Sequence, residues 1–135
     1  MAQTFNVKIL TPSKVVFEGE VQKFFVKTAE GEVEILSNHA SIIVSTVSCI
    51  TVLEDVEGTK FEFFTTQGIV NFTNNTLKFC CDQAETEEEI DLERAQEAKD
   101  RAEKRLKEPD KYDTQRAREA LLKAQIRTTL KKQSK

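Results

Sequence analysis

Apolar and polar residues alternate in the first part of the chain, which is the pattern of β-strands with one buried face. From Phe5 to Ile9, apolar side chains alternate with Asn6 and Lys8. Short segments rich in Val, Ile, Phe and Thr then recur at residues 21–27, 41–46, 50–53, 61–66 and 77–81. This spacing is typical of a sandwich or barrel.

Turn-forming dipeptides separate these segments and support the all-β interpretation. They are Glu30-Gly31, Glu57-Gly58, Gln67-Gly68 and Asn74-Asn75. Because Asn tolerates positive φ, Asn74-Asn75 predicts a tight hairpin between the strands on either side.

Some predicted strands are apolar on both faces, which a two-layer sandwich does not need. Examples are Phe24-Phe25-Val26 and Phe61 with Phe63-Phe64. This surplus predicts either an outer apolar patch for docking or a crowded corner of the core.

The pattern changes after residue 84 to one of helical period. Thr86 and Glu89 have the spacing of a capping box at a helix start. Pro109 ends the first helix, and Asp113 is suited to cap a second. The apolar positions are mostly Ala: Ala95, Ala98, Ala102 and Leu106, then Ala117, Ala120, Leu121, Ala124 and Leu130.

The short connection predicts that the two helices form an antiparallel hairpin. A seam built from Ala buries little area, so we expect the hairpin to be marginal alone and a candidate switch. The alternative is a hairpin that stays permanently docked.

Composition divides the chain at the same place. All nine Phe and all four Gly lie in residues 1–84, whereas every Arg lies in residues 85–135. We therefore predict an α+β protein with two domains: an antiparallel β-sandwich over 1–84 and a two-helix antiparallel hairpin over 85–135. The net charge of −3 disfavours a dedicated nucleic-acid binder, and no apolar run is long enough to span a membrane.

The sequence offers little for catalysis. His39 is the single histidine, and the three cysteines lack the spacing of zinc ligands. Cys80 and Cys81 are neighbours in a predicted strand, so they point to opposite faces and do not favour a mutual disulfide. No Walker-type loop is present. We therefore predict neither a catalytic site nor a metal site.

Cationic side chains share faces of the predicted helices. Arg94 and Arg101 lie about 20° apart around the first helix, and Lys123 and Arg127 share a face of the second. In a hairpin these faces can converge on a polyanion, with Asp91 accepting from a base or ribose. Arg105, Arg116 and Arg118 favour the alternative of a solvated charged surface. The basic tail after residue 114 suits an acidic protein surface or nucleic acid, but its lack of aromatic residues disfavours single-strand recognition.

The order of these features resembles the epsilon subunit of bacterial F-type ATP synthases over nearly the whole chain. The motifs are residues 30–36 (EGEVEIL) followed by His39-Ala40, residues 67–70 (QGIV) and residues 90–95 (IDLERA). The resemblance implies a non-catalytic rotor part of the central stalk that couples ion flow to ATP synthesis. Its sandwich would contact the gamma subunit and the c-ring.

The resemblance also implies regulation. In several bacterial members the hairpin extends to the catalytic beta subunits and inhibits ATP hydrolysis. Some members bind ATP between the helices; no cofactor is required, and ATP would be a regulatory ligand. By motif, the site would use Glu85, Asp91, Arg94, Arg101, Lys123 and Arg127. Lys123 stands where strong binders carry Arg, so a point charge replaces a bidentate fork.

Partner contacts are predicted at His39, Arg116, Arg118, Lys131 and Lys132. No nucleic acid is expected as a partner, and the membrane would be reached only through the complex, at the cytoplasmic face of a bacterial plasma membrane. The alternative function is a free-standing ATP-sensing or nucleic-acid-binding adaptor.

Overall fold

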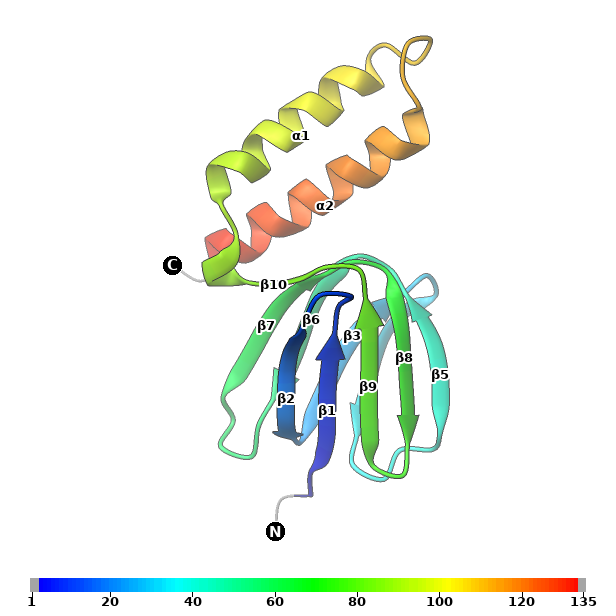
Figure 1. Ribbon diagram of the computed structural model, residues 1–135, viewed down its shortest axis with the longest axis vertical. Coiled ribbons are helices and arrows are strands. Elements are labelled where there is room, and N and C mark those ends of the chain that lie inside the picture. The colour runs from blue at the N-terminus through cyan, green and yellow to red at the C-terminus, as the bar shows by residue number, and fades with distance from the viewer. Residues whose placement is uncertain (1–2, 134–135) are drawn as a thin grey trace. The chain divides into compact units, whose positions relative to one another are not determined.

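The computed structural model describes residues 3–133 and divides the chain into two compact units, residues 1–85 and 86–135. Ten strands form the first unit and two helices dominate the second (Figure 1). The predicted fold class, a β-sandwich followed by a helical hairpin, is confirmed.

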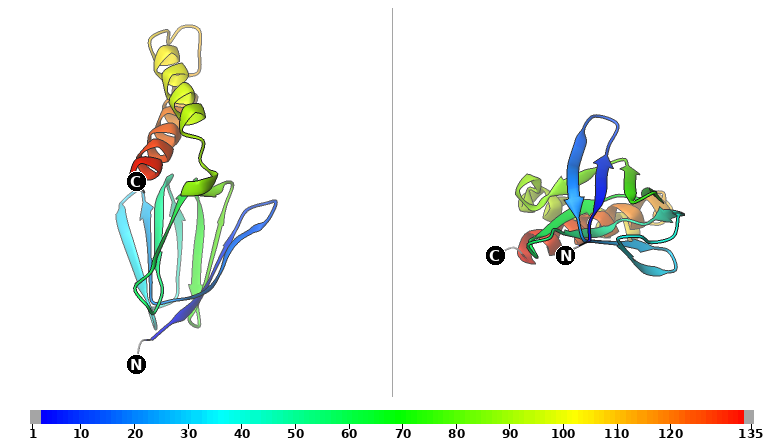
Figure 2. Two further views of the ribbon diagram at one scale, coloured as in Figure 1. Left: turned by 90° about the vertical axis from the view of Figure 1, so that its left-hand side faces the viewer. Right: turned by 90° about the horizontal axis from the view of Figure 1, so that it is seen from below.

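Two five-stranded sheets make up the first unit. One has the order β2-β1-β9-β8-β5, with bounds Val15–Val21, Phe5–Leu10, Thr76–Cys81, Gly68–Thr73 and Ile42–Thr46. The other has the order β10-β7-β6-β3-β4, with bounds Ala84–Thr86, Lys60–Thr65, Cys49–Glu54, Lys23–Thr28 and Gly31–Leu36. β1 and β9 run parallel, whereas β1 and β2 form an antiparallel hairpin that stands at an angle to the other strands (Figure 2).

The core lies between the two sheets. It is built from the side chains that point inward, which are every second residue along most strands. Phe5 and Phe72 meet edge to face with ring centroids 5.4 Å apart, and Phe24 and Phe79 do the same at 6.1 Å. All four rings are almost fully buried. Aromatic contacts of this kind add about 0.5–1.5 kcal/mol each to the energy of burial.

The predicted strand over 21–27 is wrong in its boundary, because two strands meet there. Val21 ends β2 and Lys23 begins β3. Between them, the side chain of Gln22 donates to Glu54 Oε2 and to the Asp55 carbonyl, at 3.1 and 2.8 Å. The Gln22 backbone N–H also donates to the Glu54 carbonyl at 2.8 Å, and the chain bends at this residue as it passes from one sheet to the other. The strand over 15–21 carries few fully buried residues, so its hydrophobic pattern is weak.

The predicted Asn74-Asn75 hairpin is confirmed. Both residues have positive φ, 52° and 54°, as a two-residue turn between twisted strands requires. Asn75 also exchanges hydrogen bonds with Asn38 of the β4–β5 loop: its Oδ1 accepts from Asn38 N at 2.7 Å, and its Nδ2 donates to Asn38 Oδ1 at 3.0 Å. This pair ties two loops together at the end of the sandwich.

The second unit begins with a 3-10 turn, η1 (Glu87–Glu89), followed by α1 (Leu92–Leu106) and α2 (Thr114–Gln133). The Thr86–Glu89 capping box forms, with Glu89 Oε1 accepting from Thr86 N at 3.1 Å. Its predicted place at the start of the long helix is wrong, because it caps only the 3-10 turn. Asp91 caps α1 by accepting from Arg94 N. The predicted cap of the second helix, Asp113, is confirmed.

The helices run antiparallel and pack along a seam of small residues (Figure 1). Ala95 and Ala102 of α1 are buried, as are Ala117 and Ala124 of α2. Ala120 is exposed, so it does not belong to the seam that its spacing predicts.

Candidate functional site

The cationic residues predicted to bind ATP flank the seam of the hairpin. Arg94 and Arg101 are exposed on α1, and Lys123 and Arg127 are half-buried on α2. Each comes directly before a buried seam residue: Ala95, Ala102, Ala124 and Thr128 respectively. Successive residues of a helix turn by 100°, so the residue before a seam position lies to one side of the seam. Because the two helices face each other and run in opposite directions, this is the same side for both. The fold therefore brings all four cations to one side of the hairpin.

Two further cations follow the same rule. Arg105 precedes the half-buried Leu106, and Arg116 precedes the buried Ala117. The opposite side of the seam carries fewer cations, because the residues that follow the same six positions are Gln96, Glu103, Lys107, Arg118, Gln125 and Thr129. The hairpin thus has one cationic side, which we define as Arg94, Arg101, Arg105, Arg116, Lys123 and Arg127.

The two acidic members of the predicted ATP site are placed differently. The Asp91 carboxylate caps α1, accepting from Arg94 N at 3.2 Å, so one of its oxygens is already engaged. Glu85 lies in β10 and is the last residue of the first unit, whereas the other five lie in the second.

The residues of the basic tail have unlike surroundings. Arg116 and Arg118 are exposed. Lys131 is half-buried, and its ammonium lies 3.2 Å from Glu87 Oε1 and donates to the Glu87 carbonyl at 3.2 Å. It therefore holds the end of α2 to the 3-10 turn before α1. The side chain of Lys132 lies outside the described residues.

His39 lies in the β4–β5 loop beside the Asn38–Asn75 pair. Its Nδ1 is 2.7 Å from the Ala40 carbonyl oxygen, and its ring meets the edge of Phe72 with centroids 5.9 Å apart. These contacts fix the ring at the end of the sandwich.

The exposed apolar residues of the sandwich are not the phenylalanines that the sequence singled out. Phe24 and Phe63 belong to the core and Phe61 packs against it, whereas Phe64 is buried outside the core cluster and Phe25 is half-buried. Ile43 of β5 and Ile69 of β8 are 70% and 53% exposed. In the register, Ile69 pairs with Ser45 and Ile43 with Asn71, so the two are diagonal neighbours on the outer face of one sheet.

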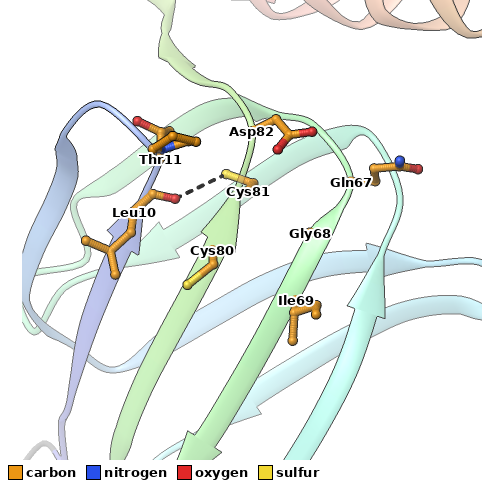
Figure 3. A pocket seen from close by; sticks show the side chains of 9 residues that line it. Leu10, Thr11, Gln67, Gly68, Ile69, Cys80, Cys81 and Asp82 are labelled. Carbon is orange, nitrogen blue, oxygen red and sulfur yellow. Dashed lines mark hydrogen bonds between the residues drawn. The ribbon is translucent and has the colours of Figure 1, made fainter.

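A shallow pocket of about 460 Å³ continues this apolar face where β1 and β9 end and β8 begins (Figure 3). Leu10, Ile69 and Cys80 supply its apolar lining. Cys80 is exposed, whereas its neighbour Cys81 is buried and lies with its Sγ 3.9 Å from the Leu10 carbonyl oxygen. Burial, with a smaller contribution from Asp82, raises the pKa of Cys81 from 9.0 to about 12. The two thiols therefore differ in their access to solvent.

Sequence reasoning did not identify the Ile43–Ile69 face or the contribution of Arg105 and Arg116 to one side of the hairpin. A signal was present for the first, because Ile42-Ile43-Val44 is apolar at three successive positions. A signal was also present for the two arginines, because Arg105 and Arg116 each come directly before an apolar position of the predicted helix seam. The partner of Lys131 had no local signal, since Glu87 is 44 residues away.

Among residues 3–133, no three His, Cys, Asp or Glu side chains gather as a metal site. No helix in that range is long and apolar enough to cross a membrane. The described residues thus form a two-unit protein: a sandwich with an exposed apolar sheet face, followed by a helical hairpin with one cationic side.

Comparisons with known proteins agree with this description. Residues 4–87 match the family described as the beta-sandwich domain of the ATP synthase Delta/Epsilon chain, and residues 88–132 match the long alpha-helix domain of the same chain. The chain is 46% identical over 132 residues to the ATP synthase epsilon chain of Clostridium botulinum strain Alaska E43, covering 98% of each. It is 44% identical to that of Clostridium novyi, covering 92% of this chain and 95% of the relative. A chain in a structure of Euglena gracilis mitochondrial ATP synthase superposes with a TM-score of 0.83 at 20% identity, covering 100% of this chain and 83% of its own length.

The chain belongs to the ATP synthase delta/epsilon family. Members of this family are accessory subunits of the synthase and not its catalytic subunits.

Proposed function

We propose that this chain works as the epsilon subunit in the central stalk of a bacterial rotary ATP synthase. The sandwich binds the gamma subunit and the c-ring, and the assembly couples ion flow to ATP synthesis. The observation that carries this proposal is the match of both units to one family, over residues 4–87 and 88–132, with bacterial relatives aligned end to end.

The apolar outer face of the sandwich supports the docking role. Ile43 and Ile69 are large, exposed and adjacent, and the pocket beside Ile69 adds a concave apolar surface. Contiguous apolar surface of this kind is more typical of an interface than of a solvated sheet. Double substitution of Ile43 and Ile69 by Ser is expected to weaken recovery of gamma in a pull-down from solubilised membranes. The exposed Thr73→Ser on β8 is the matched control.

The hairpin is the regulatory part of the proposal. In its extended form it reaches the catalytic beta subunits and inhibits ATP hydrolysis. The weak, alanine-based seam favours such a change, because little apolar area must be exposed to separate the helices. The basic residues Arg116 and Arg118 are exposed and available to acidic segments of the catalytic subunits.

Truncation after Glu89 tests inhibition. This end point keeps β10 and the Thr86–Glu89 capping box, so the sandwich stays complete, and it removes both helices. The assembled enzyme should hydrolyse ATP faster with the truncated chain than with the full chain. Equal rates, with equal incorporation of both chains, would contradict the inhibitory role but not the stalk role.

We further propose that ATP binds the cationic side of the closed hairpin through Arg94, Arg101, Lys123 and Arg127, with Asp91 and Glu85 as the acidic members. The support is the placement of the four cations on one side of the seam. In calorimetry, Arg94→Ala and Arg127→Ala should each reduce ATP affinity, whereas Arg118→Ala, on the other side, should not. Equal heats for all variants would reject the site.

The same experiments separate the alternatives. Recovery of the chain without gamma, the c-ring or catalytic subunits, together with retained ATP binding, would favour a free-standing ATP sensor.

A further inference from the structure

A cavity of about 390 Å³ lies at the turn of the hairpin, away from its open end. It is lined by Arg105 from the end of α1, by Lys111, Tyr112 and Asp113 from the connection, and by Arg116 and Ala117 from the start of α2. We call this the tip cavity. Its volume falls within the range of small-molecule sites.

The positive charges of the tip cavity are poorly compensated. Its one carboxylate, Asp113, accepts from Gln115 N at 3.1 Å and Arg116 N at 3.2 Å, so it serves to cap α2. Lys111 has one distant, exposed ion-pair partner, with its Nζ 3.9 Å from Glu108 Oε1. No ion pair forms between Arg105 or Arg116 and any residue whose side chain the structure describes, 3–131.

Tyr112 positions one of these cations. The guanidinium carbon of Arg105 lies 5.3 Å from the centroid of the Tyr112 ring. A guanidinium that uses its flat face for the ring keeps the N–H groups of its edge available as donors. The cavity thus holds a partly oriented Arg fork beside a second Arg and a Lys.

We propose that the tip cavity binds a phosphate-bearing anion through Arg105 and Arg116, with Lys111 as an added charge. Arg forks match the oxygens of a phosphate group, and a dianion would relieve the repulsion of three gathered cations. The site lies on the cationic side of the hairpin, one helical turn beyond Arg101 and further from Arg94. Arg94 and Arg105 are eleven residues apart, or about 16 Å along the helix.

The proposal does not depend on assembly into a synthase, so the isolated full chain can test it. Inorganic pyrophosphate is the probe, titrated at constant ionic strength with chloride as the balancing anion, and the NMR signals of the Arg Nε–H groups are the readout. Saturable shifts of the Arg105 and Arg116 signals are expected. Parallel titrations with inorganic phosphate and with ATP identify whether a free anion or a nucleotide tail is the better ligand.

Three variants sharpen the test, each checked by circular dichroism for unchanged helix content. Arg105→Gln with Arg116→Gln should weaken pyrophosphate binding by at least about ten-fold, the loss expected for charge-assisted hydrogen bonds. Arg118→Gln removes one charge from the other side of the seam and should leave the affinity unchanged. Arg94→Gln should leave the half-saturation of the Arg105 and Arg116 signals unchanged even where it weakens pyrophosphate binding at the proposed ATP site, which separates the two sites.

Two results would overturn the proposal. One is pyrophosphate binding that is equally weakened by Arg118→Gln, since the effect would then be diffuse charge. The other is the absence of saturable shifts at Arg105 and Arg116 up to tens of millimolar pyrophosphate.

Discussion

At Gly68, the backbones of β8 and β9 leave no room for a side chain. A Cβ at this position would collide with the Cys80 carbonyl oxygen and lie 2.9 Å from Cys81 Cα. Gly68→Ala should therefore destabilise the sandwich by about 1–3 kcal/mol, the usual cost of overpacking. Gly19→Ala is the matched control, because its Cβ would meet only the Phe17 ring at an ordinary 3.6 Å. Urea unfolding followed at β8 and β9 amide signals measures both, and equal midpoints would contradict the argument.

The adjacent cysteines differ in reactivity because neighbouring residues of a strand point to opposite faces. Cys80 is exposed, whereas Cys81 is buried with its pKa raised to about 12. At pH 8, iodoacetamide should modify Cys80 in the folded chain and reach Cys81 only in urea, as mass spectrometry would show. A raised pKa favours the folded state below pH 9.0, and this stabilisation is lost as pH rises toward 12. In Cys81→Ala, the free energy of unfolding should therefore fall less between pH 9 and 12. Rapid labelling of Cys81 in the folded chain would contradict the predicted difference between the two thiols.

At the scale of elements, an ion pair between Lys131 and Glu87 joins the two ends of the hairpin at its open end. The side chains of Lys131 and Glu87 are 24% and 29% exposed, whereas those of the Lys111–Glu108 pair at the tip are 70% and 45% exposed. Lys131→Met keeps the apolar stem and removes the charge, which should cost up to about 1 kcal/mol of hairpin stability. Amide hydrogen exchange in the last turns of α2 should quicken accordingly. Lys111→Met should have no measurable effect, and equal effects of the two variants would rule out the special role of Lys131.

Element boundaries show where local signals compete. Thr86 and Glu89 form their predicted capping box, yet the chain becomes extended and buried at Ile90 before α1 begins. Asp91 then supplies the effective cap. The capping spacing was correct, but burial of Ile90, which the cap pattern does not report, decides where the long helix begins.

At the scale of the whole molecule, the two units should differ in independent stability. The sandwich has a core of aromatic and branched side chains, whereas the buried seam of the hairpin is mainly Ala. A fragment of residues 1–89 should retain the cooperative unfolding of the sandwich. A fragment of residues 86–135 should be only partly helical in water by circular dichroism, because short helices depend on packing. Full helicity of the isolated fragment would contradict this.

The sequence by itself determined the elements whose causes are local. The strand alternation, the Asn74-Asn75 turn and the Asp113 cap all follow from the preferences of residues a few positions apart. It also carried the family motifs. Tertiary structure alone decided which apolar residues remain exposed, since the burial of Phe63 and the exposure of Ile43 depend on the sheet each strand joins. It also decided that Lys131 meets Glu87 and that Arg105 and Arg116 share a cavity. Lys131 and Glu87 are 44 residues apart, and Arg105 and Arg116 are 11 apart. Both pairs therefore come together only when the two helices pack against each other in antiparallel order.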